Sequence, residues 1–93
     1  MHFLYILASD RNGTLYTGIT NNIAARVQTH KDKVIDGFTK KYDITKLVYY
    51  HEFPTSVEAA EAERRIKRWR REWKIKLIED LNPNWDDLYY KIL

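Results

Sequence analysis

Residues 3–19 read FLYILASDRNGTLYTGI, and this stretch decides the fold. Phe3 to Leu7 are apolar or aromatic at every position, which is typical of a strand that is covered on both faces and is central in its sheet. Residues 9–13 carry turn-forming side chains, and Asn12-Gly13 tolerates positive φ. Thr14 to Ile19 alternates like a second strand. The stretch therefore predicts an antiparallel β-hairpin.

The rest of the chain predicts helices around one more strand. Residues 20–22 offer N-caps for a helix over 23–30, and a short turn or helix is expected over 38–42. A third strand is expected over 46–53 and ends at Pro54. One long helix is expected from near Val57 to the stop at Asn82-Pro83, followed by a short helix within 85–93. The order β-β-α-(α)-β-α-α predicts an α+β domain with a three-stranded antiparallel sheet flanked by helices.

Length and composition limit the architecture. A chain of 93 residues is expected to form a single domain, 1–93, too small for a TIM barrel or a two-domain cleft. It has no cysteine, which excludes disulfides and thiolate zinc sites. The longest apolar run, Phe3 to Ala8, is six residues, too short for a secretory signal or a membrane span. We therefore expect a cytoplasmic protein without membrane contact.

The basic residues are unevenly distributed. The net charge is only +3, from 16 Lys and Arg against 13 Asp and Glu. Half of the basic residues fall within 64–76, where Glu72 is the only acidic residue: Arg64, Arg65, Lys67, Arg68, Arg70, Arg71, Lys74 and Lys76. Together with seven tyrosines and three tryptophans, this concentration suggests an anionic partner, with nucleic acid the leading candidate.

Arg26 and His30 share or border the apolar face of the first predicted helix, beside Ile23 and Val27 at 3.6-residue periodicity. One interpretation is that Arg26 meets an anion or an aromatic surface there. The other is an arginine whose stem lies along the core margin, next to a histidine with satisfied hydrogen bonds. Spacing alone favours the second interpretation.

A continuous helix from residue 57 would carry two opposite stripes. Its apolar stripe would include Ala62, Ile66, Trp69 and Trp73, and we expect both tryptophans in the core. The opposite stripe would be basic, with Glu63 and Arg70 at its margin: Arg64, Lys67, Arg68, Arg71 and Lys74. This stripe is either a nucleic-acid surface or a solvated face, and Glu63 is either functional or an i,i+4 partner of Lys67.

Tyr5 and Tyr16 are explained by strand propensity alone, without any function. Gly18 is less typical of a strand interior. It suggests a bulge, or the close approach of another backbone or a ligand.

Taken together, Tyr5, then Tyr16-Thr17-Gly18, then Arg26 and His30 on a helix, then Glu63 on a later helix, resemble the GIY-YIG nuclease superfamily. The resemblance extends from Phe3 to about Leu81 and is strongest to small stand-alone bacterial proteins. Both tripeptides depart from the pattern: the first, Phe3-Leu4-Tyr5, keeps only its tyrosine, and in the second Thr17 stands where the family has Ile.

The resemblance implies a divalent-metal-dependent DNA endonuclease that is structure-selective or weakly sequence-specific. Glu63 would hold Mg²⁺ or Mn²⁺, and Arg26 would contact the scissile phosphate. Tyr5 would be the general base; a free phenol has a pKa near 10, so cationic neighbours are expected around it. His30 and Tyr16 would complete the polar cluster, and Lys40 is a further candidate for a phosphate contact.

Two other classes of function stay open. The chain is either a nucleic-acid-binding module with little turnover of its own or a protein-interaction domain that uses its basic helix. In the nucleic-acid interpretations the partner is DNA or RNA, with a protein partner supplying targeting. The expected nucleic-acid contacts, besides Lys40, are Arg64, Lys67, Arg70, Arg71 and Lys74. The sequence specifies neither the oligomeric state nor the substrate structure.

Overall fold

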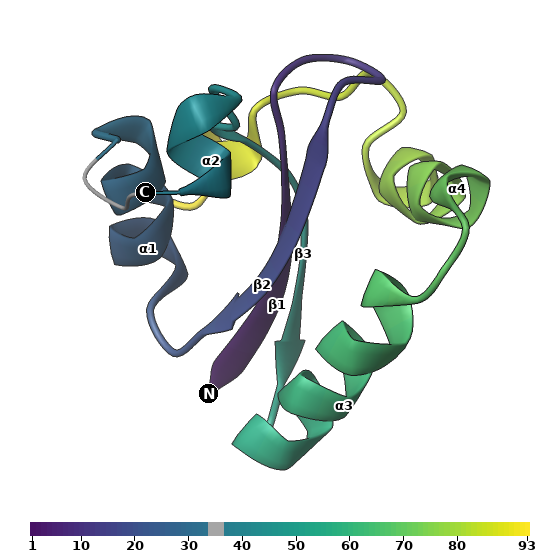
Figure 1. Ribbon diagram of the computed structural model, residues 1–93. Helices are drawn as coiled ribbons and strands as arrows, with labels where there is room; N and C mark the ends of the chain where they lie inside the picture. The colour runs from purple at the N-terminus through teal and green to yellow at the C-terminus, as the bar shows by residue number, and fades with distance from the viewer. Residues whose placement is uncertain (34–36) are drawn as a thin grey trace.

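The computed structural model describes residues 1–33 and 37–93 and shows a three-stranded sheet between two layers of helices (Figure 1). The elements in chain order are β1 (His2–Ala8), β2 (Leu15–Thr20), α1 (Ile23–Lys31), α2 (Phe38–Lys41), β3 (Lys46–Phe53), α3 (Ser56–Lys67), α4 (Arg71–Leu81) and the 3-10 helix η1 (Leu88–Lys91). The predicted α+β class with a three-stranded antiparallel sheet is confirmed.

The sheet has the order β2-β1-β3, and β1 pairs antiparallel with both neighbours. The all-apolar strand is therefore central, as its composition predicts. Tyr5 lies opposite Gly18 on one side and Tyr50 on the other. The register shifts between Ile6 and Leu7 against β3, so the irregularity of this sheet is not at Gly18.

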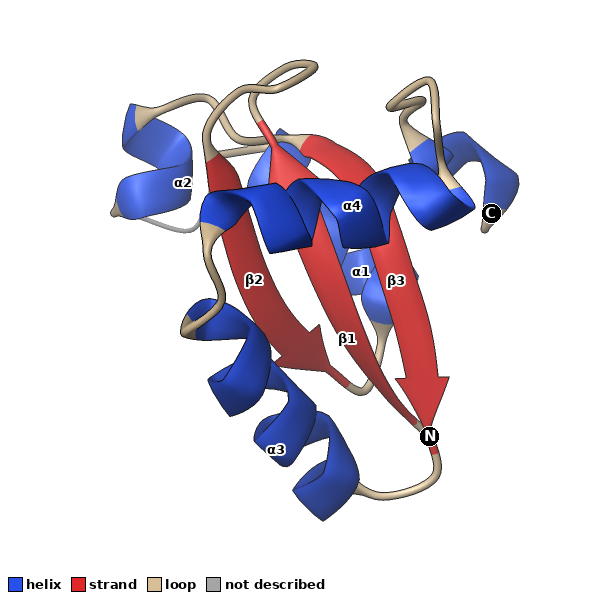
Figure 2. Cartoon of the chain, turned by 90° about the vertical axis from the view of Figure 1, so that its right-hand side faces the viewer, coloured by secondary structure: helices blue, strands red, loops and turns tan. Residues whose placement is uncertain are grey.

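Each face of the sheet has its own apolar cluster. On one face Leu4, Ile6 and Val48 pack with Ile66 and Ile78 from α3 and α4. On the other face a second cluster contains residues of α1, β1, β3 and η1: Tyr5, Leu7, Ile23, Val27, Leu47 and Leu88. Figure 2 shows α3 and α4 in front of the sheet and α1 behind it. The alternation of side chains along β1 thus serves two cores.

The single long helix predicted from residue 57 is wrong, because the chain turns between α3 and α4. The amides of Arg68 and Trp69 bond to carbonyls three residues back, at 3.1 and 3.0 Å, and Arg70 is extended with ψ of 152°. This turn sends α4 across the sheet, so that Ile66 and Ile78 both reach the same core (Figure 2). The predicted continuous stripes are therefore divided, and Trp73, expected in the core, is 53% exposed.

The C-terminal segment fastens both layers together. Trp85 joins the cluster under α3 and α4, whereas Tyr89 joins the cluster under α1. Asp87 caps η1, accepts the Leu47 amide at 3.1 Å and pairs with Lys31. The helix expected within 85–93 is thus only the short η1. None of the helices in residues 1–33 and 37–93 has both the length and the apolar character needed to cross a membrane.

Candidate active site

The hydroxyl of Tyr5 is the centre of the polar cluster. Its residue lies in the central strand and is only 1% exposed. A Cβ atom placed on Gly18, its partner in β2, would lie 2.6 Å from the Tyr5 oxygen and 2.7 Å from its Cζ. Gly18 therefore leaves the space that the phenol occupies. The sequence predicts a bulge at Gly18, or the close approach of another backbone or a ligand. The group that approaches Gly18 is instead the side chain of Tyr5.

His30 joins Tyr5 to a residue that the sequence did not single out. Its Nε2 lies 3.2 Å from the Tyr5 oxygen, and its Nδ1 lies 3.1 Å from Oγ1 of Thr39. All three residues are buried. Both ring nitrogens thus have partners, so the hydroxyl of Thr39 orients the imidazole and influences its tautomer.

Tyr16 brings a third ring to the cluster. The ring centroid of Tyr16 lies 6.3 Å from that of Tyr5 and 5.5 Å from that of His30. The hairpin places the two tyrosines together, as expected, and α1 presents His30 to them. The start of α1 is fixed by Asn22, whose side chain accepts the amide of Ala25 at 3.2 Å.

The electrostatics of Tyr5 differ from the expectation. Burial raises the pKa of the Tyr5 hydroxyl well above its usual value, and Tyr16 and Glu63 raise this pKa further. Arg26 lowers the pKa of Tyr5, but burial outweighs this effect. For His30, burial and then the charge of Arg26 lower the pKa. The resting site accordingly holds a neutral phenol hydrogen-bonded to a neutral imidazole.

Arg26 and Glu63 approach Tyr5 from opposite layers. Both act electrostatically on the Tyr5 hydroxyl, although Arg26 belongs to α1 and Glu63 to α3. Arg26 is exposed, and the Glu63 side chain is 23% exposed. Glu63 also makes the expected helix ion pair, 3.5 Å from Lys67 Nζ.

The donor set for a cation is small. Within the part of the chain that the structure describes, no group of three or more His, Cys, Asp or Glu residues could hold a metal ion. Mg²⁺ commonly binds through one or two carboxylates and keeps several waters. A single, partly exposed carboxylate such as Glu63 fits that manner of binding.

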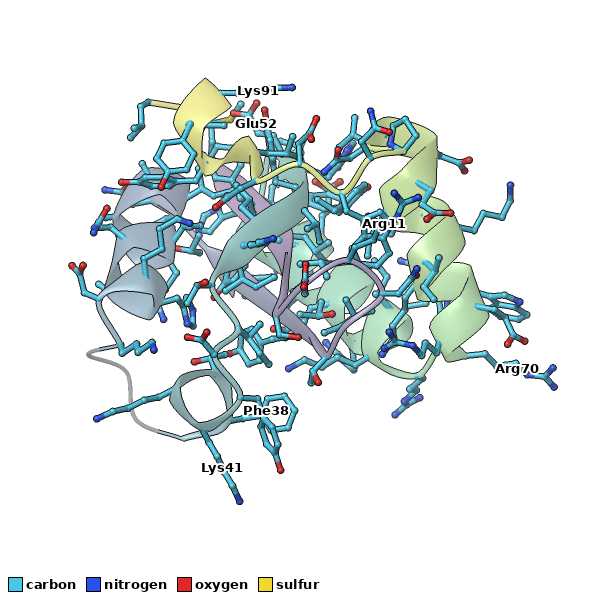
Figure 3. All side chains as sticks on the ribbon, turned by 90° about the horizontal axis from the view of Figure 1, so that it is seen from above. Arg11, Phe38, Lys41, Glu52, Arg70 and Lys91 are labelled. Atoms are coloured by element: carbon cyan, nitrogen blue, oxygen red, sulfur yellow. The ribbon has the colours of Figure 1, made fainter. Side chains whose placement is uncertain are left out.

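The predicted nucleic-acid contacts do not form one ridge. Arg71 Nη2 donates to the carbonyls of Asn12 and Gly13, both at 2.6 Å, and thereby holds the hairpin loop. Lys74 Nζ lies 3.5 Å from the carbonyl of Lys67. The others are exposed: Arg64 and Lys67 on α3, Lys40 on α2, and Arg70, which projects into solvent beside α4 (Figure 3).

Comparison with known proteins identifies the family of the chain. The family description "GIY-YIG catalytic domain" matches residues 1–76. A UPF0213 protein of Bacillus licheniformis is 40% identical over 79 residues, which cover 85% of this chain and 80% of the relative. A UPF0213 protein of Staphylococcus haemolyticus is 38% identical over 79 residues, covering 85% and 95%. The solution NMR structure of a UPF0213 protein from Bacillus halodurans aligns with a TM-score of 0.57 and 27% identity, covering 92% of this chain and 90% of the other. The resemblance drawn from the spaced residues is confirmed.

Proposed function

Because the chain belongs to the GIY-YIG family of catalytic domains, a family of nucleases, we propose that it is a divalent-metal-dependent DNA endonuclease. One observation carries the proposal: the buried Tyr5 hydroxyl is hydrogen-bonded to His30 and lies within the electrostatic reach of Arg26 and Glu63. Phosphodiester hydrolysis needs a proton acceptor, a cation at the phosphate and help for the leaving oxygen. These residue types supply the first two requirements.

The proton acceptor is a pair of side chains. Tyr5 is neutral at rest, so it takes a proton from the attacking water only by passing its own proton on. His30 Nε2, 3.2 Å away, receives that proton, because the lowered pKa of His30 leaves the imidazole neutral. Thr39 keeps Nδ1 occupied and the ring in place.

The charge on the scissile phosphate would be met from both layers. Arg26 would bind two of its oxygens through the planar guanidinium. When bound, Mg²⁺ or Mn²⁺ supplies charge neutralisation at the phosphoryl oxygens, and Glu63 is the residue that would hold it. Lys67, one turn from Glu63, and the exposed Lys40, Arg64 and Arg70 are the proposed contacts to flanking phosphates.

One alternative is favoured by two observations. The raised pKa of Tyr5 and the single carboxylate at the site also suit a nucleic-acid-binding module with little turnover. Such a module would bind DNA but would not cut it.

The test is cleavage of duplex, flap, junction and single-stranded DNA, and of matching RNA, with Mg²⁺ and with EDTA. We expect EDTA to stop cleavage. Glu63→Gln keeps the size of the side chain but weakens the metal ligand, so cleavage should fall and partly recover at high Mg²⁺ or Mn²⁺.

The matched control is Glu72→Gln, because Glu72 is a 70% exposed side chain on α4 that pairs only loosely with Arg70 at 3.8 Å. Its rate should equal that of the wild type. Cleavage that survives EDTA contradicts the proposal, and binding without any cleavage would establish the module instead.

A further inference from the structure

A pocket lies on the face of the sheet opposite the Tyr5 cluster, between α3 and the edge strand β3. It has a volume of about 230 Å³, smaller than is usual for a drug-sized ligand. Its lining is largely apolar and aromatic, and the side chains of Tyr49, His51 and Arg65 bring polar groups to it. The other lining residues are Leu4, Phe53, Ala62, Ile66 and Trp69.

A basic groove shares two residues with this pocket. Arg65 and Trp69 line both, and the groove continues along α3 past Arg64 and Arg68, with Glu61 as its one acidic residue. Among residues 1–33 and 37–93, none of these three arginines has an ion-pair partner within 4.0 Å. One exposed arginine, Arg65, thus lines the apolar pocket, and two more, Arg64 and Arg68, line the groove that adjoins it.

The faces of α3 explain the arrangement. Ala62 and Ile66 point to the sheet, Glu63 and Lys67 lie on the flank toward the Tyr5 site, and Arg65 lies on the flank toward β3. The helix ends at Lys67, and the turn that follows leaves Trp69 as a wall between pocket and groove. In a straight continuous helix, Trp69 would instead lie in the apolar stripe with Ala62 and Ile66.

We propose that this site holds one unpaired nucleotide of a nucleic-acid strand, with the base in the pocket and its phosphates on the arginines. A base needs a narrow apolar slot with an aromatic wall and a few polar edges, which Trp69, Tyr49 and His51 provide. The phosphates need cations beside that slot, which Arg64, Arg65 and Arg68 provide. The proposal rests on the proposed function only for the choice of nucleic acid as the ligand.

The placement has a consequence for the substrate. The nucleotide site lies on the α3–α4 face, whereas the Tyr5 hydroxyl lies on the α1 face. A strand held at both sites must pass around α3, and continuous duplex cannot insert a base without unpairing it. The substrate class this favours is DNA with an unpaired strand next to the cleavage point, such as a flap or a junction.

The test is equilibrium binding, measured by fluorescence anisotropy in EDTA so that no cleavage occurs. The probes are a labelled oligothymidine and a fully abasic strand of equal length and charge. Stacking of one base on an aromatic side chain strengthens binding, so we expect the wild type to bind the oligothymidine about 5- to 150-fold more tightly than the abasic strand. Arg65→Gln and Arg68→Gln should weaken binding of both strands several-fold.

Trp69→Leu should remove the preference for the base while leaving binding of the abasic strand intact. If Trp69→Leu fails to fold, Arg65→Gln still tests the site. The Arg65 side chain is exposed, so replacing it leaves the core unchanged. The matched control is Arg11→Gln, an exposed arginine in the hairpin turn, which should behave as the wild type.

Equal affinity for the two strands would overturn the proposal, as would equal effects of Arg65→Gln and Arg11→Gln. Displacement of the strand by a Glu-rich peptide bearing one tryptophan, at lower concentration than by unlabelled strand, would instead assign the site to a protein partner. A protein that cleaves DNA but shows no base preference refutes only this site. A base preference without cleavage refutes only the nuclease activity.

Discussion

At the scale of single residues, the Tyr5 hydroxyl has two opposing properties. Burial raises its pKa, which makes the phenolate inaccessible at neutral pH. A proton acceptor in the mechanism must nevertheless take up a proton from water. In the proposed mechanism the hydrogen bond to His30 would reconcile the two, because the pair would accept a proton at the imidazole without forming a phenolate at rest.

The neutral state of His30 gives the protein a pH-dependent stability. Its pKa in the unfolded chain is near 6.5 and is lowered by folding. Below pH 6.5 the unfolded state therefore binds more protons at His30 than the folded state does. The contribution of neutral His30 to the free energy of unfolding is fully present above pH 6.5. It is lost as the pH falls toward the pKa of His30 in the folded protein. Urea titrations between pH 5 and 7.5 should show this decline in the wild type and a smaller one in His30→Gln. Equal slopes in the two proteins would contradict it.

Thr39 is expected to act as a positioning residue through His30. Thr39→Val keeps the shape but leaves the buried Nδ1 of His30 without its partner, at a cost of about 1–3 kcal/mol in stability. The cleavage rate should fall and its pH profile should shift, because the imidazole is no longer held in one tautomer.

Thr39→Ser retains the hydroxyl and should restore both the rate and the pH profile. A merely structural role predicts a loss of stability for Thr39→Val with an unchanged pH profile, so the profile distinguishes the two roles.

How far the sequence could predict these residues depends on how local their geometry is. Tyr5 and Tyr16 belong to one hairpin, and Arg26 and His30 share one helix, so spacing was enough to group each pair. Thr39 lies beyond residues 34–36, and its contact with His30 depends on where α2 packs. The packing partner of Gly18 was likewise hidden, because the register with Tyr5 was needed to find it.

At the scale of elements, the turn between α3 and α4 rearranges the basic residues. Residues 57–81 contain no glycine or proline, so propensity gave no sign of a break. The break accompanies packing: Ile66 and Ile78 both bury in one cluster. A straight helix over residues 57–81 would be about 37 Å long, longer than the 28 Å extent of the molecule. Arg71, the first residue of α4, then reaches the hairpin loop.

Arg71 is expected to stabilise the fold more than it binds DNA. Arg71→Ala removes two charge-assisted bonds to the carbonyls of Asn12 and Gly13, and we expect the exposed site to lose about 1 kcal/mol of unfolding free energy. Urea denaturation measures this loss.

The comparison variant is Arg70→Ala. The Arg70 side chain is 77% exposed and lies 3.8 Å from Glu72, a surface pair that contributes little. Equal stability of Arg70→Ala and Arg71→Ala would show that the loop contact does not stabilise the protein.

At the scale of the whole molecule, the two faces of the three-stranded sheet carry different sites. One face, with α1, carries the Tyr5–His30–Thr39 chain, and the other, with α3, carries the proposed nucleotide pocket. Glu63 links the two faces, because it belongs to α3 but raises the pKa of Tyr5, whose side chain packs on the α1 face. The segment after residue 76, beyond the family match, holds the layers together through Trp85 and Tyr89.

The most direct test of the central claim, that the Tyr5 hydroxyl takes part in cleavage, is the rate of Mg²⁺-dependent cleavage by Tyr5→Phe beside Tyr50→Phe. Tyr50 lies opposite Tyr5 in the neighbouring strand, so each variant deletes one hydroxyl from the same face of the sheet. Tyr5→Phe should keep the fold and the DNA affinity while its rate falls by about 10²–10⁴, and no excess of metal should restore it. Tyr50→Phe should cleave at the wild-type rate. A Tyr5→Phe protein that cleaves as fast as Tyr50→Phe would contradict the claim.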